Sequence, residues 1–408
     1  MIRTIKTTGL MAATGLATLA LMQPAMALDA DAFVDRIETV YKAMGTEMSF
    51  GTATLSGDTI TVDGVTLTIP GEEPMVLDTE LTFSGVAEYD DGSYTMDTLS
   101  VPDIDMEFGD EHVGHLTLVD MVAEDLWLPP EGDTSAEVLL QLVGRMATGP
   151  LTVTRDGAEV IKIDGMEAAT EFVYDADDAL ESLASSLSIS NIWADLSTVG
   201  EEEPEAGAII TALGLTNISG NITQSMNWTM ADGNVVIDEF LFDFADVGAL
   251  NLTLDIAGFT PAMLDKLYAM QSSDLDPTSE EAQAQQMMAG MEVAQAMTIS
   301  GVSIRYDDAS LAGKLLDMFA AQSGADRAAF VEGLKAMLPA MIAESGIPAL
   351  ADLVVPPVSS FLDDPQSLEV AVKPASPTSV LVLAAAASNP ASLIQALGLT
   401  VTANQKSK

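Results

Sequence analysis

Runs of alternating apolar and polar residues recur through this 408-residue chain, and Asp-Gly pairs separate several of them. The clearest run places Leu250, Leu252, Leu254 and Ile256 at every second position. Successive side chains on a β-strand point to opposite faces, so this pattern predicts strands with one apolar and one polar face. Asp-Gly pairs favour tight turns between antiparallel strands. The sequence therefore predicts an extended antiparallel sheet whose strands are half buried.

Most of the predicted strands lie in residues 48–172 and 217–256. Stretches 81–108 and 217–256 each contain a strand, an Asp-Gly turn and a long alternating strand, which indicates a degenerate β repeat. Asp63-Gly64 lies where the alternation changes phase, so it is either a two-residue hairpin turn or a β-bulge. In the two copies the alternating apolar residues are Ile104, Met106 and Phe108, and Phe240, Phe242 and Phe244.

Apolar residues at helical spacing predict a helix over residues 28–45, with Asp29 or Asp31 as its N-cap and Gly45 at its end. Asp175, Asp177 and Asp178 are interpreted as a helix N-terminus, where the helix dipole favours carboxylates. Pro356-Pro357 is expected to interrupt a helix. Further helices are predicted at 136–146, 203–214, 261–271, 277–297, 310–322, 326–345, 377–387 and 390–397, and strands at 298–306, 367–373 and 399–403.

The expected fold class is α+β. We expect an extended, twisted, mainly antiparallel sheet built from degenerate β repeats, with helices packed on one side and a helical C-terminal third. The predicted divisions are a signal peptide (1–27), an N-terminal helix plus a β-rich half (28–172), a second β-rich half with inserted helices (173–306), and a helical C-terminal region with closing strands (307–408).

The first residues have the pattern of a secretory signal peptide. Arg3 and Lys6 precede an uncharged apolar stretch over residues 7–22, and Ala25-Met26-Ala27 matches the small-x-small cleavage pattern. Cleavage is expected after Ala27, which predicts export to the periplasm. The alternative is an uncleaved membrane anchor, but the apolar stretch is short for a span of about 20 residues. We expect no transmembrane anchor after signal cleavage.

The charge balance excludes some classes of partner. The chain has 62 acidic and 15 basic residues, a formal net charge of −47, so nucleic-acid binding is not expected. The absence of cysteine excludes disulfides, thiolate metal sites and cysteine nucleophiles. The acidity serves solubility or presents a surface to a basic protein partner.

No motif in the chain points to catalysis, and no catalytic residue, cofactor or metal site is assigned. His112 and His115 lie near carboxylates, but they need a helix to share a face, and this stretch is predicted to be extended. Asp103, Asp105 and Glu107 resemble the start of a calcium loop, yet the glycines that follow do not fit it. The methionines in the predicted helix at 277–297 favour an adaptable apolar face that forms core or lines a groove, rather than a copper site; they are Met287, Met288, Met291 and Met297.

Two segments carry a resemblance. The opening helix is followed by residues 56–67, with Ser56, Asp58, Ile60, Val62 and Gly64. The C-terminal region has the predicted strand 367–373, the helices that begin near Pro377 and Pro390, and Leu399-Thr-Val-Thr-Ala-Asn404. These segments resemble a family of exported Gram-negative proteins of unknown function, which implies no known activity. The alternating unit that ends at Asp246-Val-Gly-Ala-Leu250 is distantly similar to AsmA-like periplasmic β-rich proteins. That likeness implies long sheets that curve around a lipid groove.

The leading hypothesis is a non-catalytic periplasmic envelope protein that binds lipid or another hydrophobic ligand in a groove between sheet and helices. The apolar residues that would line the groove are Phe240, Phe242, Phe244, Leu252, Leu254 and Ile256. The same residues are consistent with a closed core. Two further functions fit the same sequence: a structural or interaction protein that binds a basic partner through its acidic surface, and a calcium-stabilised exported protein.

Overall fold

The protein is described by a computed structural model that covers residues 28–68, 74–109, 112–271, 279–344, 347–386 and 388–406. The predicted signal peptide lies outside the described residues. The described chain forms two compact units. The first contains the residues through Pro102 together with Asp120–Met146, and the second contains Asp103–Val119 and the residues from Ala147 onward. The strand pairings within both units are antiparallel, which confirms the predicted α+β class.

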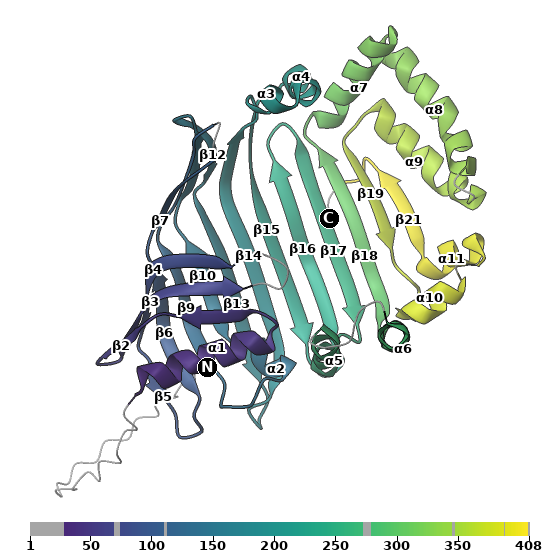
Figure 1. Cartoon of the computed structure of the whole chain (residues 1–408). Helices are drawn as coiled ribbons and strands as arrows, with labels where there is room; N and C mark the ends of the chain where they lie inside the picture. Colours follow the sequence, from purple (N-terminus) through teal and green to yellow (C-terminus); the bar gives the residue numbers. More distant parts are fainter. Residues whose placement is uncertain are drawn as a thin grey trace, which may run out of the picture. The chain divides into compact units, whose positions relative to one another are not determined.

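The first unit packs one long helix against a small sheet (Figure 1). Strands β1 and β2 both pair with β3, and the order continues through β4, β6 and β9. Strand β5 pairs with the start of β6. Its elements are α1 (Ala30–Ala43), β1 (Glu47–Phe50), β2 (Ala53–Ser56), β3 (Thr59–Thr68), β4 (Met75–Ser84), β5 (Ala87–Glu88), β6 (Tyr94–Val101), β9 (Met121–Leu128), α2 (Ala136–Leu139) and most of β10 (Val143–Thr148).

Helix α1 confirms the opening prediction. The Asp29 carboxylate accepts hydrogen bonds from the backbone N–H groups of Asp31 (3.0 Å) and Ala32 (3.2 Å), so Asp29 is the N-cap. On the face that packs on the sheet, Phe33 is fully buried. Its ring meets the rings of Phe83 and Tyr94 edge-on, with centroids 5.1 and 5.4 Å away. This cluster forms the centre of the hydrophobic core of the first unit.

Asp63-Gly64 is a bulge and not a hairpin turn. Strand β3 runs without interruption from Thr59 to Thr68, and its register with β4 shifts between Asp63 and Val65. Gly64 takes a φ of 83°, a conformation that glycine adopts readily. Gly64 of β3 faces two residues of β4, Asp78 and Thr79, and the apolar residues of β3 after it follow the shifted phase seen in the sequence.

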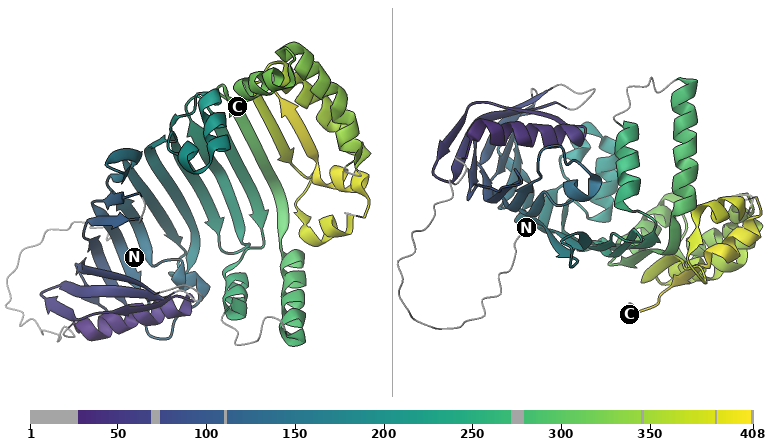
Figure 2. Two further views of the ribbon diagram at one scale, coloured as in Figure 1. Left: turned by 45° about the horizontal axis from the view of Figure 1, so that its top comes forward. Right: turned by 90° about the horizontal axis from the view of Figure 1, so that it is seen from below.

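The second unit contains a longer sheet (Figures 1 and 2). Strands β7, β8, β11 and β12 pair in that order, and β12 and β13 both pair with β14. The order then runs through β15, β16, β17, β18, β19 and β21, with β20 also on β18. The strands are β7 (Ile104–Phe108), β8 (Gly114–Leu118), β11 (Leu151–Arg155), β12 (Ala158–Ile163), β13 (Gly165–Tyr174), β14 (Leu180–Asp195), β15 (Asn217–Thr229), β16 (Asn234–Phe244), β17 (Gly248–Ala257), β18 (Thr298–Asp308), β19 (Ser367–Val372), β20 (Thr378–Ser379) and β21 (Leu399–Ala403).

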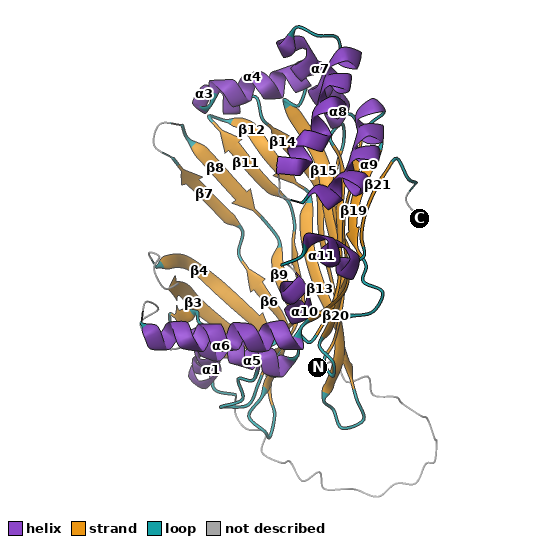
Figure 3. Ribbon diagram, turned by 90° about the vertical axis from the view of Figure 1, so that its right-hand side faces the viewer, coloured by secondary structure: helices purple, strands orange, loops and turns teal. Residues whose placement is uncertain are grey.

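Several helices of the second unit lie at the two ends of these strands, and α9 packs on β19 and β21 (Figures 1 and 3). Helices α5 and α6 connect β17 to β18 at one end, whereas α4 contacts α7 at the other. Figure 2 shows α5 and α6 side by side beyond the strand ends. The helices are α3 (Val199–Glu202), α4 (Pro204–Leu213), α5 (Pro261–Gln271), α6 (Glu280–Ala296), α7 (Leu311–Ser323), α8 (Arg327–Glu344), α9 (Ala351–Asp363), α10 (Val380–Ala386) and α11 (Pro390–Leu397), with a 3-10 turn at Pro348–Leu350.

The acidic segment at 175–178 is a hairpin turn, so the prediction of a helix N-terminus was wrong. The Asp175 carboxylate accepts hydrogen bonds from the N–H groups of Asp177 (2.8 Å) and Ala179 (3.0 Å). Asp178 takes a φ of 63°. An aspartate that bonds to the backbone two residues onward stabilises a turn as readily as a helix start. The long strands β13 and β14 pair on either side of this turn.

Three other predictions need correction. Helix α9 runs through Pro356 and Pro357 without interruption, and the Asn404 side chain donates to the Ser360 carbonyl at 3.1 Å. The packing of α9 on β19 and β21 stabilises the helix although the two prolines lack backbone donors. The helix predicted at 136–146 ends at Leu139 and is followed by strand β10. Part of the helix predicted at 377–387 is the short strand β20.

The two predicted repeat copies take different positions. Stretch 217–256 forms the adjacent strands β15, β16 and β17 of the second unit. The strands of stretch 81–108 are divided between the units, because β4 and β6 belong to the first and β7 to the second.

Candidate hydrophobic binding face

One face of the second unit's sheet is apolar across β16 to β21. Residues paired directly across neighbouring strands lie on the same face of a sheet. The pairing therefore places side chains in rows that run across the strands. We call the following residues of three successive rows the apolar face: Phe242, Leu250, Tyr306 and Leu368; Phe240, Leu252, Ile304, Val370 and Val401; and Ile237, Leu254, Val302, Val372 and Leu399.

The structure brings the six predicted groove residues to this one side of the sheet. Phe240 and Leu252 are direct partners, Leu254 pairs with Ile237, and Ile256 pairs with Val235. The rings of Phe240 and Phe242 touch, with centroids 4.7 Å apart. Phe244 continues the same alternation along β16, and its ring occupies the space where Gly220 has no side chain. The strand pairing therefore groups these residues on the side that their periodicity indicated.

A bulge on β16 extends the apolar face beyond what the alternation predicted. The register between β16 and β17 shifts between Ile237 and Phe240. Strict alternation would place these two residues on opposite sides, since they are separated by an odd number of positions. The bulge returns Ile237 to the side of Phe240, opposite Leu254.

The opposite side of the same strands is mainly polar and internally hydrogen bonded. The Thr253 and Ser303 hydroxyls lie 2.7 Å apart, and Thr223 donates to the Glu239 carboxylate at 2.9 Å. Arg305 donates from Nε to the Asp307 carboxylate at 2.7 Å. This interaction with Asp307, together with the Glu369 carboxylate, raises the pKa of Arg305. The sheet therefore has two chemically distinct sides.

The apolar face is only partly covered. The six predicted groove residues are all half-buried. Farther along the rows, Leu250 is 36%, Val370 41% and Ile304 49% exposed. The core of the first unit differs, because Phe33 and Ile60 have no exposed surface there. Contiguous exposed apolar surface of this kind in a folded protein marks binding sites.

An aromatic side chain forms a hydrogen bond to the backbone near each end of the strands that carry the apolar face. At the α5 end, Trp228 donates from Nε1 to the Phe259 carbonyl at 2.9 Å, and the two rings lie 5.3 Å apart. At the α7 end, the Tyr306 hydroxyl lies 2.7 Å from the Val247 carbonyl and 2.8 Å from an Asp308 carboxylate oxygen. Burial, followed by the Asp308 interaction, raises the pKa of Tyr306, so the phenol is neutral.

The methionines of α6 are exposed and do not form core. Met287, Met288 and Met291 are 61–73% exposed. The core interpretation of the sequence is therefore wrong for these three residues. Their exposed thioethers give α6 an apolar surface of its own.

The two histidines contact two separate carboxylates on the second unit. His112 Nδ1 lies 2.8 Å from the Asp156 carboxylate, and His115 contacts Asp105 across β7 and β8. Asp156 sits in the β11–β12 turn and also accepts from the Val113 N–H at 3.1 Å. Among the described residues, no three His, Asp or Glu side chains are arranged to hold a metal ion.

The contact with His112 affects the pKa of Asp156, and this effect can be measured. The hydrogen bond from His112, followed by that from Val113 N–H, holds the pKa of Asp156 below its ordinary value. A lowered folded-state pKa contributes stability above the unfolded-state pKa, and that contribution is lost as the pH falls through the folded-state value. His112→Gln is expected to raise the Asp156 pKa toward normal in an NMR titration, whereas His115→Gln leaves it unchanged. Equal Asp156 titrations in wild type and His112→Gln would contradict this assignment.

Comparisons with known proteins add one family match. A family model described as "Uncharacterized protein" matches residues 241–404, which include most of the apolar face and the C-terminal helices. No curated protein matches the chain. In the part of the chain that the structure describes, no helix combines the length and apolar character needed to cross a membrane. Over residues 241–404 the chain is thus similar to a family of uncharacterized proteins.

Proposed function

We propose that this protein is a non-catalytic, exported envelope protein that binds the acyl chains of a lipid on the apolar face of its second unit. The observation that carries the proposal is the partial exposure of that face. Burial of apolar surface contributes roughly 25 cal/mol per Å². An acyl chain laid over Leu250, Ile304 and Val370 would remove their exposed surface from water.

The rows suit an extended chain. Neighbouring strands are about 4.8 Å apart, so the row from Phe240 to Val401 crosses five strands over roughly 19 Å. Along this row the side chains are Phe, Leu, Ile, Val and Val, with no polar interruption. Such a strip matches an alkyl chain in length and in chemistry.

The charge of the protein restricts the headgroup. With a formal net charge of −47, the protein repels anionic headgroups. A neutral, zwitterionic or cationic lipid is therefore the expected ligand. Binding of such a lipid is expected to be less sensitive to salt than binding of a charged protein partner, because apolar contacts are not screened.

Native mass spectrometry of protein purified from its own host tests the proposal. We expect co-purified lipid on the wild-type protein, and loss of most of it in the double variant Ile304→Gln/Val370→Gln. Both residues are at least 41% exposed, so the substitutions should not disturb folding. The matched control is Ser303→Gln/Ala371→Gln, which places the same side chains on the polar side of the same strands. Equal lipid on both double variants, or lipid-free wild type, would exclude the apolar face as the site.

The proposed location has its own test. Export followed by leader removal predicts a mature N-terminus at Leu28, which Edman sequencing of periplasmic protein would detect. Replacing Ala27 with Phe is expected to block cleavage and leave the precursor in the membrane fraction. Protein recovered from the cytoplasm with Met1 intact would contradict periplasmic location.

A further inference from the structure

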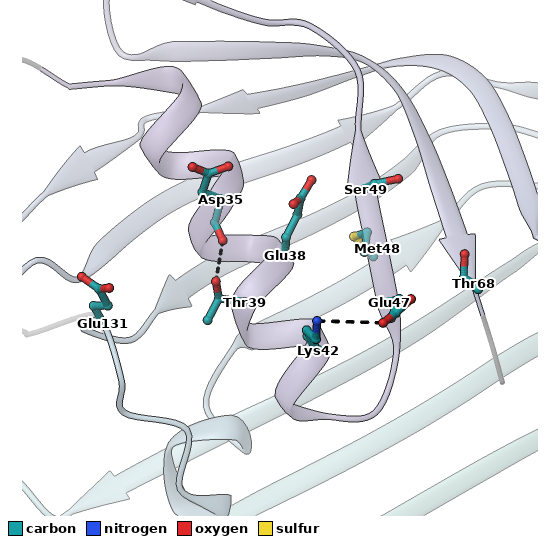
Figure 4. Close-up of a pocket in the computed structure, with 9 residues that line it drawn as sticks. All are labelled: Asp35, Glu38, Thr39, Lys42, Glu47, Met48, Ser49, Thr68 and Glu131. Carbon is teal, nitrogen blue, oxygen red and sulfur yellow. Dashed lines mark hydrogen bonds and ion pairs between the residues drawn. The ribbon is translucent and has the colours of Figure 1, made fainter. Parts of the chain in front are cut away.

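Exposed carboxylates gather at two places that differ in their surroundings. On the flank of α1 they line an open cleft of about 610 Å³, where Lys42 lies 3.9 Å from Glu47 (Figure 4). In the second unit, Asp105 and Glu107 lie instead on strand β7, which is next to β8 at the edge of the sheet (Figure 3). An edge strand offers unpaired backbone groups beside its charges, so it can recognise a partner in a way that surface carboxylates alone cannot.

The outer edge of β7 is open. Among the described residues, β8 is the only strand that pairs with β7. Every residue from Asp105 to Phe108 is exposed. Folded proteins usually shorten, bend or cover such an edge, because its free N–H and C=O groups can pair with another chain. The structure therefore leaves one side of this strand available for pairing.

The strand pairing identifies the backbone groups at this edge. At the two ends of β8, the Val113 and Val119 carbonyls accept hydrogen bonds from backbone N–H groups that flank β11, at 2.8 and 2.9 Å. Backbone groups alternate in direction along a strand, so the odd-numbered residues of β8 face β11 and the even-numbered ones face β7. The even-numbered residues of β8 pair with the even-numbered residues of β7. The N–H and C=O groups of Asp105 and Glu107 therefore point outward.

Large apolar side chains lie beside these backbone groups. Met106, Phe108 and Val113, which lies in the loop between β7 and β8, are each exposed over about half of their surface. Met106 pairs with Leu116 on β8, and Leu116 pairs with Val153 on β11, so an apolar row ends at the open edge. A strand added outside β7 would continue this row and remove its exposed end from water.

The acidic side chains determine which strand fits the edge. In an antiparallel pair, residues whose backbone groups face the partner lie opposite residues of the same kind. If two copies of this chain paired through β7, their outward-facing acids would therefore lie opposite one another, and like charges in that position are destabilising. Asp105 contacts His115, whereas Glu107 has no ion-pair partner among the described residues. A strand with lysine or arginine opposite these two acids forms favourable pairs instead.

We infer that the outer edge of β7 binds an extended segment of a partner protein, in which basic residues alternate with apolar ones, as an added antiparallel strand. Backbone hydrogen bonds to Asp105 and Glu107 provide affinity, and the alternating side chains provide specificity. The basic residues lie opposite the two acids, and the apolar residues continue the row that ends at Met106. This edge is separate from the apolar face on β16 to β21, so the inference does not depend on the proposed lipid binding.

Fluorescence anisotropy with a labelled peptide tests the inference at about 0.15 M ionic strength, where non-specific charge attraction is largely screened. The probe is Lys-Val-Lys-Val-Lys-Val-Lys, in two forms of equal charge that carry the same number of N-methyl groups. Methyl groups on the valines remove N–H groups that point away from β7, whereas methyl groups on the lysines remove those that face it. We expect the valine-methylated form to bind at least about tenfold more tightly than the lysine-methylated form.

Two variants of one residue separate the backbone contribution from the charge. Glu107→Gln removes only the charge and is expected to weaken the valine-methylated peptide about twofold to fivefold. Glu107→Pro also removes an outward N–H, and we expect it to weaken the peptide by at least about tenfold. Proline is tolerated on an edge strand where its nitrogen faces solvent, and circular dichroism would show whether the variant folds. Asp352→Asn, on α9, is the matched charge control and should leave the affinity unchanged.

Three results would overturn the inference. The first is equal binding of the two methylated peptides to the wild-type protein, which is decisive even if Glu107→Pro does not fold. The second is equal affinity in folded Glu107→Pro and Glu107→Gln. The third is a dimer in analytical ultracentrifugation that Glu107→Pro abolishes, because a second copy would then occupy the edge. Ile304→Gln/Val370→Gln should bind the peptide normally, so failure of the lipid proposal and failure of this inference are distinguishable.

Discussion

Phe33→Ala is expected to lower the free energy of unfolding of the first unit by about 3–5 kcal/mol, the range for truncating a buried phenylalanine. Phe33 has no exposed surface, and its ring contacts those of Phe83 and Tyr94. The substitution removes both edge-to-face contacts and leaves a cavity under α1. Because Phe33 is the largest of the four buried side chains of α1, we expect the helix to loosen from the sheet. Urea denaturation followed by circular dichroism would measure the loss.

Tyr89→Ala is the matched control for this prediction. Tyr89 is an aromatic residue of the same unit, but it is 53% exposed. Its truncation is expected to change the free energy of unfolding by no more than about 0.5 kcal/mol. Equal losses for Phe33→Ala and Tyr89→Ala would show that α1 does not pack on the sheet as described.

Gly233→Ala is expected to destabilise the second unit by about 3 kcal/mol, the combined effect of backbone strain and overpacking. Gly233 has a φ of 62°, and an alanine there incurs roughly 1–2 kcal/mol of strain. A Cβ at this position would also lie 2.4–2.5 Å from backbone atoms of Phe259 and Thr260. Backbone cannot move aside as a side chain end can, so overpacking adds about 1–3 kcal/mol. The displaced Phe259 carbonyl is the acceptor of the Trp228 indole, so tryptophan fluorescence should report the change.

Gly157→Ala separates backbone strain from overpacking. Gly157 also has a positive φ, 81°, in a turn of the same unit, but a Cβ there meets nothing within 4 Å. We expect only the conformational strain of about 1–2 kcal/mol, with the Trp228 emission unchanged. If the two variants lost the same stability, the close approach of the Phe259 backbone would carry no energetic weight.

Local patterns account for what could be predicted. Asp29 and the apolar spacing after it define α1, because capping and amphipathic periodicity act within one element. The Asp-Gly turn at 156–157 joins β11 and β12 in a hairpin, as Asp-Gly pairs are expected to do, since its conformation depends only on its own residues.

The errors have a common physical origin. Leu180, Leu183 and Leu187 are spaced i, i+3 and i+7, which is typical of a helix, and yet they lie on strand β14. A register shift near Tyr174, opposite Leu180, and pairing along both edges of the strand override that local pattern. The helix through Pro356 and Pro357 likewise persists because it packs on β19 and β21.

The candidate sites were also predictable from the sequence only in part. Periodicity alone assigned Phe240, Leu252 and their neighbours to one side of a sheet, because side-chain direction on a strand follows sequence parity. Periodicity does not predict how much of that side is exposed, because the exposure depends on which helices lie over it. The open edge of β7 had no sequence signal either, because an edge is defined by which strands pair with one another.

The sequence by itself determined the α+β class, several Asp-Gly turns and the two-sided character of the strands, all of which arise from interactions between residues close in the chain. Only the tertiary structure decided which strands neighbour one another, where bulges return Ile237 and Val65 to an apolar side, and which apolar side chains stay exposed. Those outcomes depend on contacts between distant segments, and the free energy of such contacts is not encoded in any local pattern of residues.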